Sequence, residues 1–91
     1  MENGDIYKMK YLSETIELMT SQNYDDRLKA EYYQLKLRMS GLSKMLVDYS
    51  LGELKFTPKC SYDLLHAQYR AMDLYLQYLV DRAEIEGIKL D

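Results

Sequence analysis

Two apolar stripes of equal length constrain this chain more than any other feature of its sequence. In residues 23–50 and again in residues 61–86, apolar side chains recur at alternating spacings of three and four. That spacing keeps them on one face of an α-helix, so each segment is predicted to be a long amphipathic helix. The first stripe comprises Leu28, Tyr32, Leu35, Met39, Leu42, Leu46 and Tyr49, and the second comprises Tyr62, Leu65, Tyr69, Met72, Leu76, Leu79 and Ala83.

The two stripes also predict how the helices pair. If the chain turns back near residues 55 and 56, the stripes face each other antiparallel, and the numbers of facing residues add to 111. The facing pairs include Leu28 with Ala83, Met39 with Met72, and Tyr49 with Tyr62. Flanking charges fit the same register, because residues on one side of an antiparallel seam approach each other. They place Lys36 near Asp73, and Glu31 near Arg82.

The predicted fold is therefore all-α, a single domain built on a long antiparallel helical hairpin with a shorter N-terminal helix. Its expected parts are an N-terminal helix at about residues 5–21, a first arm at 23–50, a loop at 51–60, a second arm at 61–86 and a tail at 87–91. A two-helix hairpin has a thin core, so a third helix or a partner chain is expected to cover it. We therefore expect an oligomeric helical bundle.

Capping residues support these boundaries. Asn23 and Ser61 precede the two arms and are good N-caps, because their side-chain oxygens can accept hydrogen bonds from the first turn. Gly52 and Gly87 follow the arms, where a left-handed C-cap is common. Ile88 is then expected to fold back onto the second arm.

Three further expectations concern local packing. The N-terminal helix should present a face that includes Leu12, Ile16 and Met19. Gly41 costs stability inside a helix, which favours close approach by another helix at that position, with a tolerated accident as the alternative. Phe56 is expected to tuck over the open end of the hairpin.

The residues give little support to an enzyme. Cys60 is the only cysteine and His66 the only histidine, so one chain lacks the ligands for a His/Cys metal site. A Cys60–His66 nucleophilic pair has no orienting group, and the four glycines are isolated rather than gathered in a phosphate-binding loop. We expect no catalytic residues, no cofactor and no metal.

Charge and hydropathy limit the partners in the same way. No apolar run is long enough to span a membrane, and a net charge of −3 argues against broad nucleic-acid binding. A single cysteine suits a reducing cytoplasm. Local binding of a small anion remains compatible with this composition.

One side of the hairpin combines cationic and aromatic residues. The second arm carries an additional stripe at three- and four-residue spacing, and the first arm carries polar residues on the same side. Arginine can bind phosphate through two parallel hydrogen bonds, and tyrosine offers a ring on which a base can stack. The predicted ligand-binding residues are Arg38, Tyr75, Tyr78, Arg82, Gln34 and Gln68, with Tyr7 and Tyr11 from the N-terminal helix. The alternative is a solvated flank in which Glu31 pairs with Arg82 and Arg38 lies over Tyr75.

Three stretches of the chain resemble a family of short phage and prophage proteins that are named for their relation to a crAss-like phage reading frame. These stretches are residues 25–38, 52–60 and 75–88. The resemblance implies a setting in the cytoplasm of a phage-infected host. It implies no particular activity.

The layout is also similar to the helical hairpins of phage sponge proteins, which sequester the nucleotide messengers of CBASS and Thoeris defence without cleaving them. The likeness implies a homo-oligomer that binds a cyclic nucleotide or an ADP-ribose derivative. The alternatives are a protein-interaction module that inhibits a host defence or nuclease protein through a helical face, and a phage structural or assembly helper.

Overall fold

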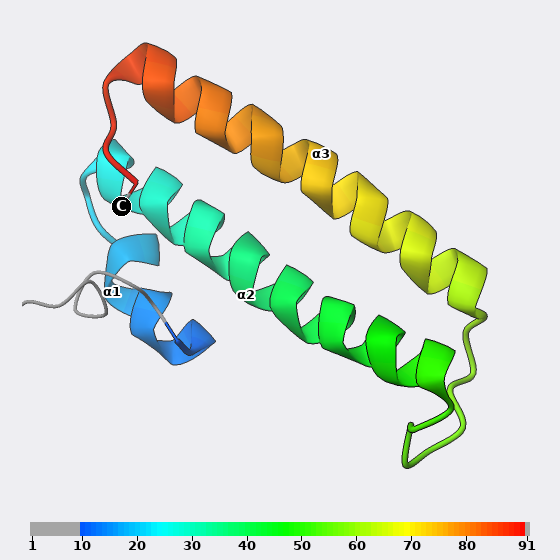
Figure 1. The fold of residues 1–91 in the computed structure, drawn as a ribbon. Coiled ribbons are helices and arrows are strands. Elements are labelled where there is room, and N and C mark those ends of the chain that lie inside the picture. Colours follow the sequence, from blue (N-terminus) through cyan, green and yellow to red (C-terminus); the bar gives the residue numbers. More distant parts are fainter. Residues whose placement is uncertain (1–9, 91) are drawn as a thin grey trace, which may run out of the picture.

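The computed structural model describes residues 10–90 and consists of three helical layers (Figure 1). The elements are a 3₁₀ turn, η2 (Leu12–Thr15), followed directly by the short helix α1 (Ile16–Met19) and the long helices α2 (Tyr24–Leu51) and α3 (Tyr62–Glu86). Helices α2 and α3 form the predicted antiparallel hairpin. The N-terminal segment, η2 with α1, packs on α2 on the side away from α3.

The predicted caps are present at both ends of both arms. The Asn23 side chain accepts a hydrogen bond from the Asp25 amide, and the Ser61 side chain accepts one from the Leu64 amide. Gly52 and Gly87 adopt left-handed conformations with φ values of 72° and 71°. These are the positions where only glycine reverses the chain without steric cost.

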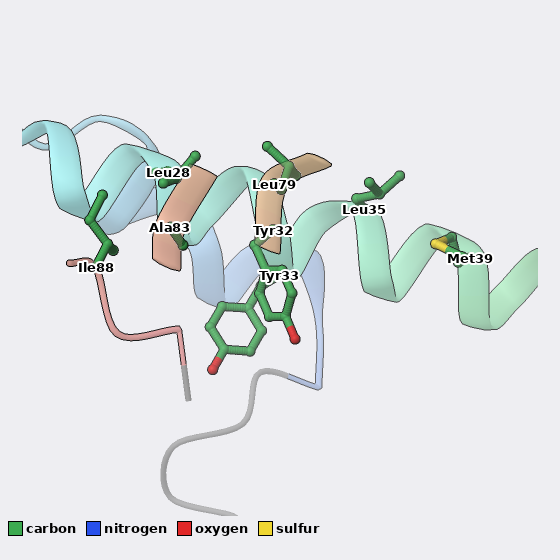
Figure 2. Packing of buried hydrophobic residues seen from close by; sticks show 8 residues of the cluster. All are labelled: Leu28, Tyr32, Tyr33, Leu35, Met39, Leu79, Ala83 and Ile88. Carbon is green, nitrogen blue, oxygen red and sulfur yellow. The ribbon is translucent and has the colours of Figure 1, made fainter. Parts of the chain in front are cut away.

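The core lies at the end of the hairpin where the tail meets the start of α2. Leu28, Leu79 and Ala83 are almost fully buried there, and Ile88 joins them because its amide donates to the Ala83 carbonyl at 2.8 Å (Figure 2). The predicted fold-back of Ile88 is thus confirmed. The Tyr33 hydroxyl also fixes the tail, by donating to the Leu90 carbonyl at 2.6 Å.

The predicted register agrees with the packing along the seam. Met72 packs against the buried cluster that contains Met39. At the loop end, the rings of Tyr49 and Tyr62 meet edge to face with centroids 5.5 Å apart. Burial is uneven, however, because residues 62–78 of α3 contain no fully buried side chain.

The N-terminal segment presents a different face from the predicted one. Leu12, Ile16 and Met19 are exposed, while Thr15 is buried against α2 at 1% exposure. The segment begins as a 3₁₀ turn with three residues per turn, which shifts the inward positions away from those of a regular α-helix. Residues 5–9 of the predicted helix lie outside the described residues.

The expectation for Phe56 was wrong, because its side chain is 58% exposed. The preferred explanation for Gly41 was also wrong for the described residues, since a Cβ built there meets no atom of residues 10–90 within 4 Å other than the backbone of its own helix turn. Gly41 therefore occupies open space in the middle of a helix.

This openness predicts that Gly41→Ala stabilises the protein. Alanine loses less backbone entropy than glycine in a helix interior, so the free energy of unfolding should rise by about 0.5–1 kcal/mol. Urea denaturation followed by circular dichroism measures the change. Gly52→Ala is the matched control, because Gly52 also has open space but a positive φ of 72°. That variant should be destabilised, and a gain in both variants would contradict the argument.

Candidate functional site

The predicted cationic and aromatic residues lie on exposed helix surface. Arg38 is on α2, whereas Tyr75, Tyr78 and Arg82 follow each other on α3 at spacings of three and four. Tyr75 is 41% exposed and Tyr78 is 57% exposed, so both rings are open to solvent. That Arg38 shares a ligand with the two tyrosines stays a prediction.

Arg82 is held in place by residues from both arms of the hairpin. Its Nη2 donates to the Tyr24 hydroxyl at 2.8 Å, and its Nε lies 3.9 Å from a carboxylate oxygen of Glu86. The hydrogen bond to Tyr24 raises the pKa of the Arg82 guanidinium, and the charges of Glu31 and Glu86 act in the same direction. The side chain of Arg82 is still 48% exposed. A positive charge is therefore oriented at the surface of α3, about one helical turn along the chain from the exposed Tyr78.

The predicted proximity of Glu31 to Arg82 agrees with the effect of the Glu31 charge on the Arg82 pKa, although other residues make the direct contacts with Arg82. Glu31 contributes to the field at Arg82 but is not the residue that holds it, because Tyr24 and Glu86 lie closer. Lys36 places its Nζ 5.2 Å from the centroid of the Tyr32 ring. This cation–π contact belongs to the side of the hairpin away from Arg82.

Tyr24 was missed by the sequence reasoning. The hairpin register sets Tyr24 opposite Gly87, which is adjacent to Glu86. The long side chain of Arg82 can reach Tyr24 from the preceding turn of α3. That signal was present in the sequence. It was overlooked because Tyr24 lies outside the apolar stripe.

Gln34 is engaged by the N-terminal segment. Its Nε2 donates to the Thr15 hydroxyl at 2.9 Å and lies 3.1 Å from the Met19 sulfur. Thr15 in turn donates to the Leu12 carbonyl at 2.7 Å, which satisfies its buried hydroxyl. Gln34 therefore joins η2 and α1 to α2, which agrees with the expectation that the N-terminal helix covers this side of the hairpin, while its role in ligand binding stays a prediction.

The remaining predicted site residues are Gln68, Tyr11 and Tyr7. Gln68 is exposed on α3, with its Nε2 4.0 Å from the Met72 sulfur. Tyr11 is exposed beside η2, which packs on α2 and not on α3. Tyr7 lies outside the described residues.

Two shallow hollows occur on the outer surface of α3, away from Arg82. The larger, of about 490 Å³, is lined by residues that include Arg70, Leu74 and Gln77. The smaller, of about 400 Å³, is lined by Asp63, His66, Ala67 and Arg70. Arg70 borders both hollows, and neither contains a residue predicted for ligand binding.

The described part of the chain contains neither a metal-binding cluster nor a membrane-spanning helix. Among residues 10–90, no group of three or more His, Cys, Asp or Glu side chains is arranged to hold a metal ion. None of the described helices is long and apolar enough to cross a membrane. His66 instead stacks on Tyr62, with ring centroids 5.8 Å apart and an interplanar angle of 14°.

Comparison with known proteins gives a family for the hairpin. The family model described as Sequestin matches residues 22–85. These residues include all of α2 and all of α3 except its last residue, Glu86. No curated protein and no solved structure matched the chain. Because the match covers well over half of the sequence, the chain belongs to the Sequestin family.

Proposed function

We propose that this protein binds a nucleotide-derived immune signal of the host cell and sequesters it without cleaving it, as a phage counter-defence protein in the host cytoplasm. The family name supports a sequestering role. The observation that carries the proposal is the oriented Arg82 guanidinium, fixed by Tyr24 and Glu86 on the helix face that also exposes Tyr75 and Tyr78.

The chemistry of this surface suits a phosphorylated ligand. A guanidinium offers planar, paired N–H donors for phosphate oxygens, and exposed tyrosine rings provide flat surfaces for a base. Arg82 keeps half of its surface open although it is held by neighbours, so its donors remain accessible. The net charge of −3 does not oppose local binding, because distant carboxylates are screened beyond about 8 Å at physiological salt.

Calorimetry with a panel of cyclic nucleotides and ADP-ribose derivatives tests binding directly. A bound ligand is then released by heating the protein and weighed by mass spectrometry. An unchanged ligand mass supports sequestration, whereas a cleaved ligand contradicts it. Absence of binding to every member of the panel favours inhibition of a host protein through a helical face.

Variants of the two arginines test the site. Arg82→Ala and Arg38→Ala should each weaken binding by about tenfold or more, since each removes a charge-assisted hydrogen bond to phosphate. Arg70→Ala is the matched control, because it removes the same charge from the outer surface of α3 and should leave the affinity unchanged. Tyr24→Phe separates positioning from binding, since it keeps the Arg82 guanidinium but removes its hydrogen-bond partner. Equal affinities in all four variants would refute the assigned site.

Tyr75 distinguishes stacking from hydrogen bonding. Stacking on one aromatic ring contributes about 1–3 kcal/mol, so Tyr75→Ala should weaken binding by roughly tenfold or more. Tyr75→Phe keeps the ring and should bind almost as the parent does. A loss of affinity in Tyr75→Phe equal to that in Tyr75→Ala would assign the role to the hydroxyl group.

A further inference from the structure

The hydroxyl group of Tyr24 still has a hydrogen to donate. It accepts a hydrogen bond from Nη2 of Arg82 at 2.8 Å, and a phenol that accepts one bond keeps its own O–H as a donor. Within residues 10–90, no acceptor takes that O–H, and Tyr24 is 42% exposed. The donor is therefore available to a molecule outside the protein.

Arg82 also keeps most of its donors. A guanidinium carries five N–H groups, and the bond to Tyr24 uses one of them. The Glu86 carboxylate lies 3.9 Å from Nε, which is close enough for an ion pair but too long for a hydrogen bond. With 48% of its side chain exposed, Arg82 can present paired N–H groups to an oxyanion.

These two donor groups come from different arms of the hairpin and meet at one place. Tyr24 is the first residue of α2, and Arg82 lies in the last part of α3. Because Nη2 and the hydroxyl oxygen are only 2.8 Å apart, an anion bound to the guanidinium lies within reach of the hydroxyl as well. A phosphate group offers several acceptor oxygens, so one can bind the guanidinium while another binds the phenol.

The neighbouring carboxylates make a second donor important. The charges of Glu31 and Glu86 act on Arg82, so they repel an anion that approaches the guanidinium. Glu86 also competes with the anion for the same positive charge. In the described chain no carboxylate is bonded to the Tyr24 hydroxyl, so this donor adds to anion binding without displacing a protein partner.

We propose that Tyr24 is a ligand-binding residue, whose hydroxyl donates to the same phosphate group that the Arg82 guanidinium binds. Tyr24 then accepts a hydrogen bond from Arg82 and donates one to the phosphate, so the phosphate joins the two arms at this end of the hairpin. The assignment rests on the proposed function for its nucleotide ligand. The phosphate contact itself is tested without a nucleotide.

Inorganic phosphate is the probe for this contact. The full chain is titrated with phosphate at constant ionic strength, and the NMR signal of the Arg82 Nε–H group reports binding. Tyr24→Phe should weaken phosphate binding by about three- to tenfold, because one hydrogen bond is lost. Tyr49→Phe is the matched control, since it removes a hydroxyl near the other end of α2 and should leave the affinity unchanged. Circular dichroism of both variants should match that of the parent.

A fluorinated tyrosine separates a direct contact from a positioning role. Fluorine beside the hydroxyl withdraws electrons, which makes the phenol a stronger donor and a weaker acceptor. At about pH 6.5, where phenols stay protonated, Tyr24→fluorotyrosine should tighten phosphate binding by about twofold. If the hydroxyl only holds Arg82, the weaker acceptor should loosen the guanidinium and lower the affinity.

Glu86 tests the competition for the guanidinium. Glu86→Gln removes the competing carboxylate and should tighten phosphate binding by about two- to fivefold at low salt. Glu84→Gln is the control, because it removes the same charge from an exposed position that makes no ion pair with Arg82 among the described residues. An equal gain in both variants would mean that only the overall charge of the chain matters.

The outcomes distinguish this contact from the proposed function. An Arg82 signal that phosphate does not shift, unchanged affinity in Tyr24→Phe, or weaker binding in the fluorotyrosine variant overturns the contact. Phosphate binding with the expected losses, but no binding of any nucleotide in the panel, supports the contact and counts against the proposed function. Nucleotide binding that Arg82→Ala weakens and Tyr24→Phe does not supports the proposed function and overturns the role of Tyr24.

Discussion

Replacing Leu79 by alanine is expected to lower the free energy of unfolding by about 3–5 kcal/mol, the upper part of the range for truncating a buried leucine. Leu79 has 0% exposure and lies in the cluster that joins the two arms to the tail. Truncation removes the apolar contacts that Leu79 makes in the buried cluster. It also leaves a cavity that the close-packed surroundings fill only in part. A loss of this size is a large fraction of the stability of a small domain.

Urea denaturation followed by circular dichroism measures the loss. Leu51→Ala is the matched control, because it makes the same substitution at a leucine that is 63% exposed at the end of α2. That control should change the stability by less than about 0.5 kcal/mol. Similar losses in both variants would mean that the core is not centred where the arms meet the tail.

The second large effect concerns the facing pair of Leu28 and Ala83. Leu28→Ala opens a cavity and should cost about 2–5 kcal/mol, whereas Ala83→Leu overfills the same cluster and should cost about 1–3 kcal/mol. Both residues are 2% exposed and belong to one buried cluster. The double variant conserves the total volume, so it should be more stable than the sum of the two single losses predicts.

A double-mutant cycle gives the coupling between the two positions. Contacting residues typically couple by about 0.5–3 kcal/mol, whereas distant residues add within about 0.5 kcal/mol. Glu84→Leu provides the control for Ala83→Leu, because it adds a leucine one position away on the exposed surface. Strict additivity of Leu28→Ala and Ala83→Leu would refute the register in which these residues face each other.

Much of the fold was predictable because it depends on local rules. Helix boundaries followed from Asn23, Ser61, Gly52 and Gly87, whose capping roles depend on a few neighbouring atoms. The seam followed from a periodic pattern that only one antiparallel alignment satisfies throughout. Such features can be read from one sequence because each is decided within a turn of helix or by a simple repeat.

The misses concern contacts between elements. Thr15 faces α2 because the N-terminal segment begins as a 3₁₀ turn, and nothing in the apolar spacing indicates that geometry. The contact of Gln34 with Thr15 was not predicted residue by residue, because it depends on where a separate segment docks. The direct partners of Arg82 were likewise missed, because a long side chain reaches Tyr24 and Glu86 in addition to the predicted neighbour Glu31. The helical spacing of residues predicts the side of the helix on which a residue lies. It does not predict which of several neighbours within reach a long side chain contacts.

The uneven burial along the hairpin has a consequence for its motion. The arms are anchored at one end, where the tail and the buried cluster meet, while at the other end Leu46 is the single buried side chain among residues 40–78. Local opening is easiest where few apolar contacts must break, so amide hydrogens near the loop should exchange with solvent sooner than those near the tail. The hairpin is thus expected to be rigid where the tail meets α2 and more flexible near the loop that joins the two arms. Opening at the loop end therefore leaves intact the buried cluster that specifies the fold.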